Sequence, residues 1–284
     1  MRCHITHRTR YDYGRRVFLE PHLVRLVPRG DACQRLLAFS AVIDPEPVGR
    51  TLVTDALGNT VLTAWFADMT DHFEVTTEAV VETLRANPFE YLVETSRAVL
   101  PVPLDRIEAV VGAACLARPE GAVRRVQALA ETLRHGNAAP QDFALALLGW
   151  VSANLRTVVR LEPGILDPDA VLAAGEASCR DLAVFFIAAC RHVGIPARFV
   201  SGYHEGDPDS DERDLHAWAE LCLPGGGWRG FDPTLGLAVA DRHVVLAAAP
   251  HPDDASPVSG TFRGDGATAS LTHAIRFEAS RATG

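Results

Sequence analysis

Apolar and polar residues alternate through much of the first 85 residues of the chain. Such alternation, with many β-branched side chains, predicts strands, and turn-forming residues separate one run from the next. The strand candidates are residues 23–27, 60–66 and 72–81. Several short strands at this spacing are typical of a small sandwich or barrel. We therefore predict a β-sandwich-like N-terminal domain over residues 1–100, which ends in a linker rich in Pro.

In the middle of the chain, the apolar residues follow the period of a helix instead. Residues 119–136 and 140–155 carry apolar side chains every three or four positions, each run opening at a Pro. A third such stripe starts near residue 179 and ends before Gly194. Alternation then returns in three candidate strands, at residues 197–203, 216–223 and 228–232. Residues 101–284 are thus predicted to form a second domain, with a helical N-terminal part and an antiparallel sheet. The predicted fold class is α+β.

Charge and hydropathy exclude several classes of partner. The 284 residues carry a net charge of −9 and a pI near 5.6, which favours neither nucleic acid nor an acidic membrane surface. No window approaches the 18 or so uninterrupted apolar residues of a membrane span. Residues 1–8 lack the apolar run of a signal peptide, so we expect a cytoplasmic protein.

All 27 basic residues are Arg, and the sequence contains no Lys. This excludes chemistry that depends on a lysine, such as a Schiff base, a phosphate-loop Lys or a Ser–Lys dyad. It also denies the chain any lysine side chain that could serve as an amine acceptor for cross-linking to itself.

Six cysteines are scattered along the chain without any Cys-x-x-Cys pair, at positions 3, 33, 115, 179, 190 and 222. In a reduced compartment such residues serve packing or reactivity rather than disulfide bonds. A zinc site would have to draw on Cys179, Cys190, His192 and His216, but Cys190 belongs to the apolar stripe of a helix. We therefore expect neither a metal nor a cofactor.

An acidic stretch at residues 205–214 and a Pro/Asp-rich stretch at 250–257 are expected to be solvated loops. The first resembles a calcium loop only in part, because Asp207, Asp209 and Asp211 alternate there. A calcium loop also needs Gly at its sixth position and Glu at its twelfth, where this chain has Glu212 and Trp218.

Cys179 is the cysteine whose position indicates reactivity. It precedes the third apolar stripe, so it stands at or near a helix N-terminus, where free N–H groups and the helix dipole favour a thiolate and can stabilise an oxyanion. The turn at residues 224–227 folds the next two strands into a hairpin, which places position 216 opposite roughly position 235. His216 and Asp232 then lie at the same end of that hairpin. A Cys, a His and an Asp so arranged can supply a nucleophile, a base and a residue that orients the base.

These residues, with several others, resemble the transglutaminase-like superfamily, and in particular its bacterial branch, whose members are often described as cysteine proteases. The matching segments of the core are 175–181 (Gly-Glu-Ala-Ser-Cys-Arg-Asp), 194–198 (Gly-Ile-Pro-Ala-Arg), 200–203 (Val-Ser-Gly-Tyr), 216–218 (His-Ala-Trp) and 230–234 (Gly-Phe-Asp-Pro-Thr). Residues 7–13, 25–29 and 55–59 resemble that branch's N-terminal β domain, and residues 253–260 its C-terminal end. The resemblance implies a papain-like core with a catalytic triad of Cys179, His216 and Asp232. Arg180 departs from the pattern, because many members have Gln there.

Three functions follow as hypotheses. The first is a cysteine peptidase or amidase that acts on a protein or peptide through a thioester intermediate, with water as the acceptor. The second is transfer of the acyl group to an amine, as in transglutaminases. The third is a binding module that keeps the fold without turnover.

Overall fold

The computed structural model describes residues 1–118, 121–160, 162, 164–206 and 214–281. The N-terminal strands are β1 (Arg2–Leu19), β2 (His22–Val24), β3 (Gln34–Asp44), β4 (Gly49–Thr54), β5 (Thr60–Trp65) and β6 (Met69–Thr83). The helices are α1 (Arg106–Leu116), α2 (Arg124–Arg134), α3 (Pro140–Asn154), α4 (Pro168–Ala174) and α5 (Cys179–His192). The later strands are β7 (Arg156–Thr157), β8 (Glu176–Ala177), β9 (Ala197–His204), β10 (His216–Leu223), β11 (Gly227–Asp232), β12 (Leu237–Ala238), β13 (His243–Ala249), β14 (Val258–Ser259), β15 (Phe262–Arg263) and β16 (Ala269–Ser280). A 3₁₀ turn, Pro252–Ala255, links β13 to β14.

Two antiparallel sheets build the N-terminal part. One has the order β15-β1-β6-β3, with β16 also paired to β1, and the other has the order β14-β2-β5-β4. Every second residue of the first half of β1 is buried, as the alternation in the sequence predicts. The apolar faces of the two sheets meet in one core that includes Phe73 and Leu19. The predicted β-rich N-terminal part is therefore present.

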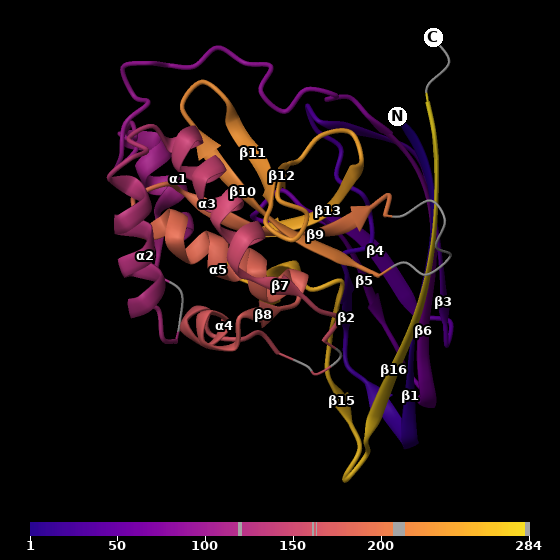
Figure 1. Cartoon of the computed structure of the whole chain (residues 1–284). Coiled ribbons are helices and arrows are strands. Elements are labelled where there is room, and N and C mark those ends of the chain that lie inside the picture. Colours follow the sequence, from indigo (N-terminus) through magenta and orange to yellow (C-terminus); the bar gives the residue numbers. More distant parts are fainter. Residues whose placement is uncertain (119–120, 161, 163, 207–213, 282–284) are drawn as a thin grey trace.

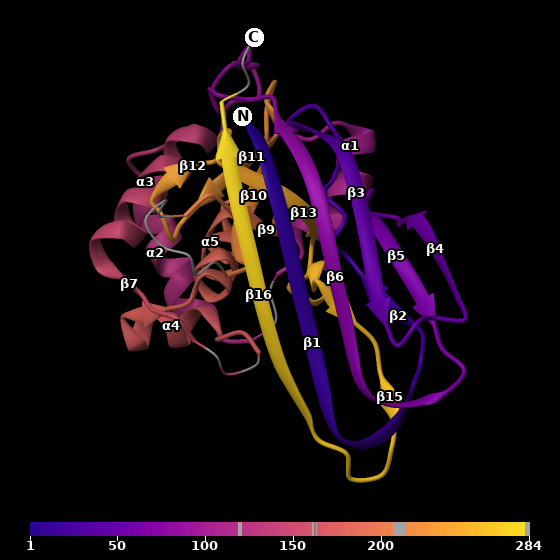
Figure 2. The ribbon, with the colours of Figure 1, turned by 90° about the vertical axis from the view of Figure 1, so that its right-hand side faces the viewer.

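The C-terminal residues return to these N-terminal sheets. β16 runs antiparallel along β1 from Arg2 to Tyr13, and β14 and β15 pair with β2 and β1. Figure 2 shows β16, β1, β6 and β3 side by side. The predicted division at residue 100 assigns these three C-terminal strands to the second domain, whereas their hydrogen bonds are made with strands of the first.

A third antiparallel sheet, which we call the core sheet, has the order β12-β11-β10-β9-β13. It lies between the helices and the N-terminal sheets (Figure 1). Phe185 and Phe186 of α5 are fully buried in the core between the helices and this sheet, and such burial contributes roughly 1.5–3 kcal/mol per side chain. The other face of the sheet packs on the N-terminal core through Tyr203 and Leu246. Burial on both faces explains why every residue of β13 is buried.

The predicted α+β class is confirmed, and the three predicted helices correspond to α2, α3 and α5. The sequence analysis missed α1 and α4. Helix α1 leaves Ile107, Val110 and Val111 largely exposed, so it lacks the apolar stripe that marks a packed helix. Helix α4 has only seven residues. No helix in the described part of the chain has both the length and the apolar character that crossing a membrane requires.

Candidate active site

Cys179 is the first residue of α5 and is partly exposed. The preceding residue, Ser178, donates from its backbone N–H and its hydroxyl to Oδ2 of Asp181, at 3.1 and 2.6 Å. Asp181, which lies in the first turn of the helix, therefore stabilises that turn through its hydrogen bonds to the N-cap residue Ser178. The thiol lies at the positive end of the 14-residue helix, as predicted.

Asp181 also ties a distant loop to the start of this helix. Its carboxylate is fully buried and accepts hydrogen bonds from Arg160 (Nε and Nη2, 3.0 and 2.9 Å) and from the backbone N–H of Leu166 (2.8 Å). Burial raises the pKa of Asp181, but its hydrogen bonds to Arg160 and Ser178 outweigh burial and lower it. Arg180 donates to the carbonyl groups of Arg160 and Glu162. The sequence analysis missed Asp181, although a Ser followed three positions later by an acid is a helix-start signal.

The β10–β11 hairpin brings His216 and Asp232 together. Ala219 pairs with Phe231 and Leu223 with Gly227, and this register, continued, puts His216 opposite Thr234, one position from the prediction. Gly225 and Gly227 have positive φ angles in the turn, a conformation that glycine adopts without strain. His216 Nε2 lies 2.6 Å from Asp232 Oδ2. Because the side chain of His216 is 15% exposed and that of Asp232 is fully buried, the imidazole connects the carboxylate to the surface.

The environment of His216 favours its charged form. Burial lowers its pKa, but the hydrogen bond to Asp232 and the proximity of Cys179 raise it to about 10. Since Nε2 faces Asp232, Nδ1 is the nitrogen that remains for the thiol of Cys179. The structure thus joins His216 and Asp232 by a hydrogen bond and places Cys179 near enough to the imidazole to affect its pKa.

Within the described part of the chain, four hydrogen bonds hold Asp232. Oδ2 accepts from His216 and also from Nε2 of His243 at 3.0 Å, while Oδ1 accepts from the backbone N–H groups of Thr234 (2.9 Å) and Leu235 (3.1 Å). Burial raises the pKa of Asp232, but the two imidazoles hold it well below its usual range. The carboxylate is therefore ionised and fixed in one orientation.

Two further histidines surround this centre, and the sequence analysis found neither. His243 begins β13 and is buried, and His204 ends β9 with its ring 4.6 Å from that of His243 and 5.9 Å from that of His216. Burial, followed by the two neighbouring imidazoles, lowers the pKa of His204 to about 4. His204 ends one apolar strand and His243 begins another, so no neighbouring sequence motif indicated a catalytic or binding role for either.

The metal hypotheses can be compared with these positions. Within the described part of the chain, His216, Asp232 and His243 bring three ligand atoms within 4.8 Å of one another. The two hydrogen bonds to Oδ2 already join these atoms, so a metal ion would have to displace both. Of the residues considered for zinc, Cys190 is fully buried in the apolar core and His192 bonds Glu131 at 2.9 Å. The calcium candidates Asp207, Asp209 and Asp211 lie outside the described residues.

The two tryptophans of the β10–β11 hairpin differ in their surroundings. Trp218 is fully buried and packs edge-on against His243, with ring centroids 5.1 Å apart. Trp228 carries the guanidinium of Arg198 over its ring, at 4.1 Å from the centroid. Trp218 is therefore a core residue that packs behind the imidazoles.

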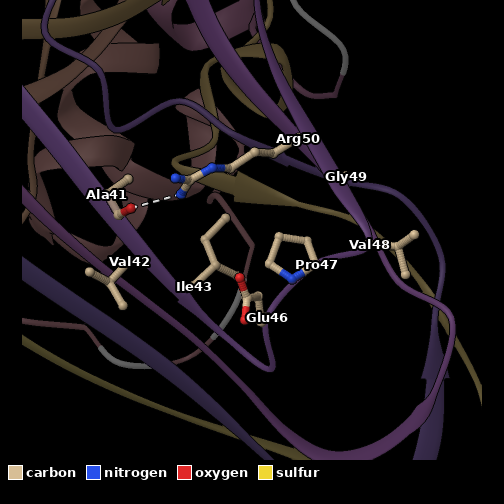
Figure 3. Close-up of a pocket in the computed structure, with 8 residues that line it drawn as sticks. All are labelled: Ala41, Val42, Ile43, Glu46, Pro47, Val48, Gly49 and Arg50. Carbon is tan, nitrogen blue, oxygen red and sulfur yellow. Dashed lines mark hydrogen bonds between the residues drawn. The ribbon is translucent and has the colours of Figure 1, made fainter.

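A cavity of about 470 Å³ lies apart from this site, between β3 and β4 (Figure 3). It is lined by Ala41, Val42, Ile43, Glu46, Pro47, Val48, Gly49 and Arg50. Arg50 donates to the carbonyl of Ala41 across it. No cysteine or histidine lines the cavity, so it contributes none of the chemistry around Cys179.

Comparison with known proteins gives matches to both parts of the chain. Residues 127–233 match the family model of the transglutaminase-like superfamily, and residues 3–82 match that of the bacterial transglutaminase-like N-terminal region. An uncharacterized protein of Mycobacterium tuberculosis is 28% identical over 285 residues, covering 91% of this chain and 87% of that protein. A protein-glutamine gamma-glutamyltransferase of Pseudomonas aeruginosa is 32% identical over 125 residues, which cover 40% of this chain and 19% of that protein.

Among solved structures, a “Putative Cysteine Protease” from Cytophaga hutchinsonii superposes with a TM-score of 0.73 at 21% identity. The match covers 100% of this chain and 92% of that one. This likeness extends the shared fold over the N-terminal sheets as well as the core.

Proposed function

This chain belongs to the transglutaminase-like superfamily, whose members are cysteine-dependent enzymes, and we propose that it hydrolyses an amide bond in a protein or peptide. The observation that carries the proposal is the hydrogen-bonded pair of His216 and Asp232 with Cys179 close to the imidazole. The thiol stands at a helix N-terminus, its imidazole partner has a raised pKa, and a buried carboxylate holds that imidazole.

Acylation would begin from a thiolate on Cys179 and an imidazolium on His216. The thiolate sulfur attacks the carbonyl carbon of the amide, and the N–H groups of the first turn of α5 are available to stabilise the oxyanion. His216 then gives its proton to the leaving amine, so that the C–N bond breaks and a thioester forms.

Deacylation would reverse the proton transfer. Neutral His216 takes a proton from water, the hydroxide formed attacks the thioester, and the thiolate leaves as the carboxylic acid is released. Asp232 does not exchange protons in this cycle. It orients the ring of His216 and stabilises its charged form, the role that a carboxylate has in such triads.

Transfer of the acyl group to an amine is a second candidate. It is favoured by the similarity of part of this chain to the protein-glutamine gamma-glutamyltransferase. Both reactions share the thioester and differ only in what attacks it. Because the chain has no Lys, it offers no lysine amine of its own as the acceptor.

The test is incubation with a protein or peptide pool and a labelled primary amine. New chain termini, or released ammonia without incorporated label, would support hydrolysis if Cys179→Ala abolishes them. Cys33→Ala removes another partly exposed thiol and is the matched control, expected to keep the activity. Efficient Cys179-dependent incorporation of the amine into Gln side chains would overturn the hydrolase proposal in favour of transfer. Absence of any product together with an unreactive Cys179 would indicate a binding module.

A further inference from the structure

We propose that His243 is a positioning residue for the reaction proposed above, because it holds the Asp232 carboxylate in the orientation that serves His216. The inference rests on the proposed function. It assigns a role to an imidazole that lies outside the Cys179, His216 and Asp232 set.

The first argument is the geometry around one oxygen atom. Oδ2 of Asp232 accepts from His216 at 2.6 Å and from His243 at 3.0 Å, and both donors are Nε2 atoms. Backbone N–H groups occupy Oδ1. Each donor restricts rotation of the carboxylate about its bond to the chain, and His243 supplies the second donor on the oxygen that His216 uses.

The second argument concerns the other nitrogen of His243. Because the ionised carboxylate only accepts, Nε2 of His243 must carry the proton, which leaves Nδ1 as an acceptor. Nδ1 is buried and has no hydrogen-bond partner among the described residues. An unpaired buried acceptor is a cost that an apolar ring of the same shape would avoid. Packing alone therefore does not account for an imidazole here, whereas donation from Nε2 does.

The third argument is that the N-terminal part of the chain fixes the strand that begins with His243. β13 is an edge strand of the core sheet, and two side-chain amides bond its backbone. Gln34 donates to the carbonyl of Val245 (2.9 Å) and accepts from its N–H (2.7 Å). Asn59 does the same with Ala248, at 3.1 and 2.8 Å. These paired contacts imitate a neighbouring strand, so the N-terminal sheets supply the support behind His243.

The surroundings of His243 define the variants that test this role. Its ring packs on those of Trp218 and His204, so His243→Phe keeps an aromatic ring but loses the donor. His243→Gln loses the ring but can place an amide N–H where Nε2 lies. His243→Asn offers the same amide on a shorter side chain that does not reach Asp232. His204→Phe is the matched control, since His204 belongs to the same cluster and makes no hydrogen bond to Asp232.

The measurement is the second-order rate constant for alkylation of Cys179 by iodoacetamide, read by peptide mass. We expect His243→Phe to lower it roughly tenfold, the factor that corresponds to loss of one hydrogen bond to a charged group. His243→Gln should restore it to within about threefold of the original chain, and His204→Phe should leave it within about twofold. Circular dichroism establishes that each variant is folded. If His243→Phe does not fold, a comparison of His243→Gln with His243→Asn makes the same test. We then expect Cys179 to be alkylated more slowly in His243→Asn.

Two results would overturn the inference. One is a His243→Phe variant that alkylates at the original rate, and the other is a His243→Gln variant as slow as Phe or Asn. Failure of the proposed function would look different, because Cys179 of the unmodified chain would then not react preferentially, or would react independently of His216.

Discussion

Asp232 and Glu220 are both buried carboxylates of the core sheet, yet they are neutralised in opposite ways. Glu220 accepts from Nη2 of Arg29 at 2.9 Å and from Nε of Arg198 at 2.8 Å. Burial raises the pKa of Glu220, and the two guanidinium groups outweigh it and lower the pKa. Among the described residues, Asp232 has no arginine partner and relies on two imidazoles and two backbone N–H groups.

This difference distinguishes a carboxylate that supports the structure, Glu220, from one that takes part in proton transfer through its partner, Asp232. A guanidinium stays charged at every ordinary pH, so the ion pairs of Glu220 are permanent and link the N-terminal part to β9 and β10. An imidazole can give and take a proton, so the contacts of Asp232 respond to the state of His216. Only the second arrangement can support general acid–base catalysis.

The largest effect is expected from Asp232→Asn. The variant loses the charge that stabilises the imidazolium of His216, and its NH₂ group must face either two imidazole donors or two backbone N–H donors. We expect turnover, and the rate of Cys179 alkylation at about pH 6, to fall roughly 100-fold or more. Near-original rates in a folded variant would mean that another residue orients His216.

Glu220→Gln should have the converse effect, a loss of folding stability with little change in the reactivity of Cys179. It leaves Arg198 without its counter-charge and leaves Arg29 with Asp31 as its carboxylate partner, and removal of one partner of a buried pair costs about 3–5 kcal/mol. We expect urea unfolding at neutral pH to show a loss of this order. The alkylation rate of Cys179 per folded molecule should stay within about twofold of the original. An unchanged free energy of unfolding would show that the ion pairs contribute little.

A third buried titratable group is His7, whose hydrogen-bond partners among the described residues are uncharged. It contacts the hydroxyls of Tyr203 and Thr9, both at 2.8 Å, and burial lowers its pKa to about 4. The unfolded chain, with a His pKa near 6.5, then binds more protons than the folded chain between about pH 6.5 and 4, so folding stability falls as the pH falls through this window.

This loss should amount to about 2 kcal/mol at about pH 5. Urea unfolding at about pH 7.5 and pH 5 measures it. His7→Gln removes the titrating group and should show a correspondingly smaller loss between the two pH values. An equal loss in both chains would assign the pH dependence to other groups.

The smallest effect is expected for Glu278, a carboxylate that is paired with an arginine as Glu220 is, but that is exposed. Glu278 pairs with Arg276 on β16 at 2.5 Å, with both side chains more than half exposed. Exposed pairs contribute about 0–1 kcal/mol, so Glu278→Gln should leave the unfolding midpoint nearly unchanged. If Glu278→Gln lost as much free energy of unfolding as Glu220→Gln, burial would not explain the difference between the two ion pairs.

The parts of the site that could be predicted from sequence are those built from neighbouring residues. Cys179 could be placed at a helix start because the apolar stripe begins directly after it. His216 and Asp232 could be brought together because one glycine-rich turn fixes the register of a single hairpin.

The parts that could not be predicted depend on contacts between distant segments. His243 reaches Asp232 because β13 pairs with β9 rather than with its neighbour in sequence, β12. Likewise, nothing local indicates that β16 pairs with β1, more than 250 residues away. Arg160 and Asp181 meet only because a loop folds back onto the start of α5.

The most direct test of the account is the order in which the six thiols react. Limiting iodoacetamide at about pH 6, followed by peptide mass mapping, should label Cys179 first, because burial raises the pKa of the other five thiols while a charged His216 adjoins Cys179. The preference should disappear in His216→Ala. Earlier labelling of Cys33 or Cys222, or labelling of Cys179 that is indifferent to His216→Ala, would contradict the assignment of Cys179 as the nucleophile.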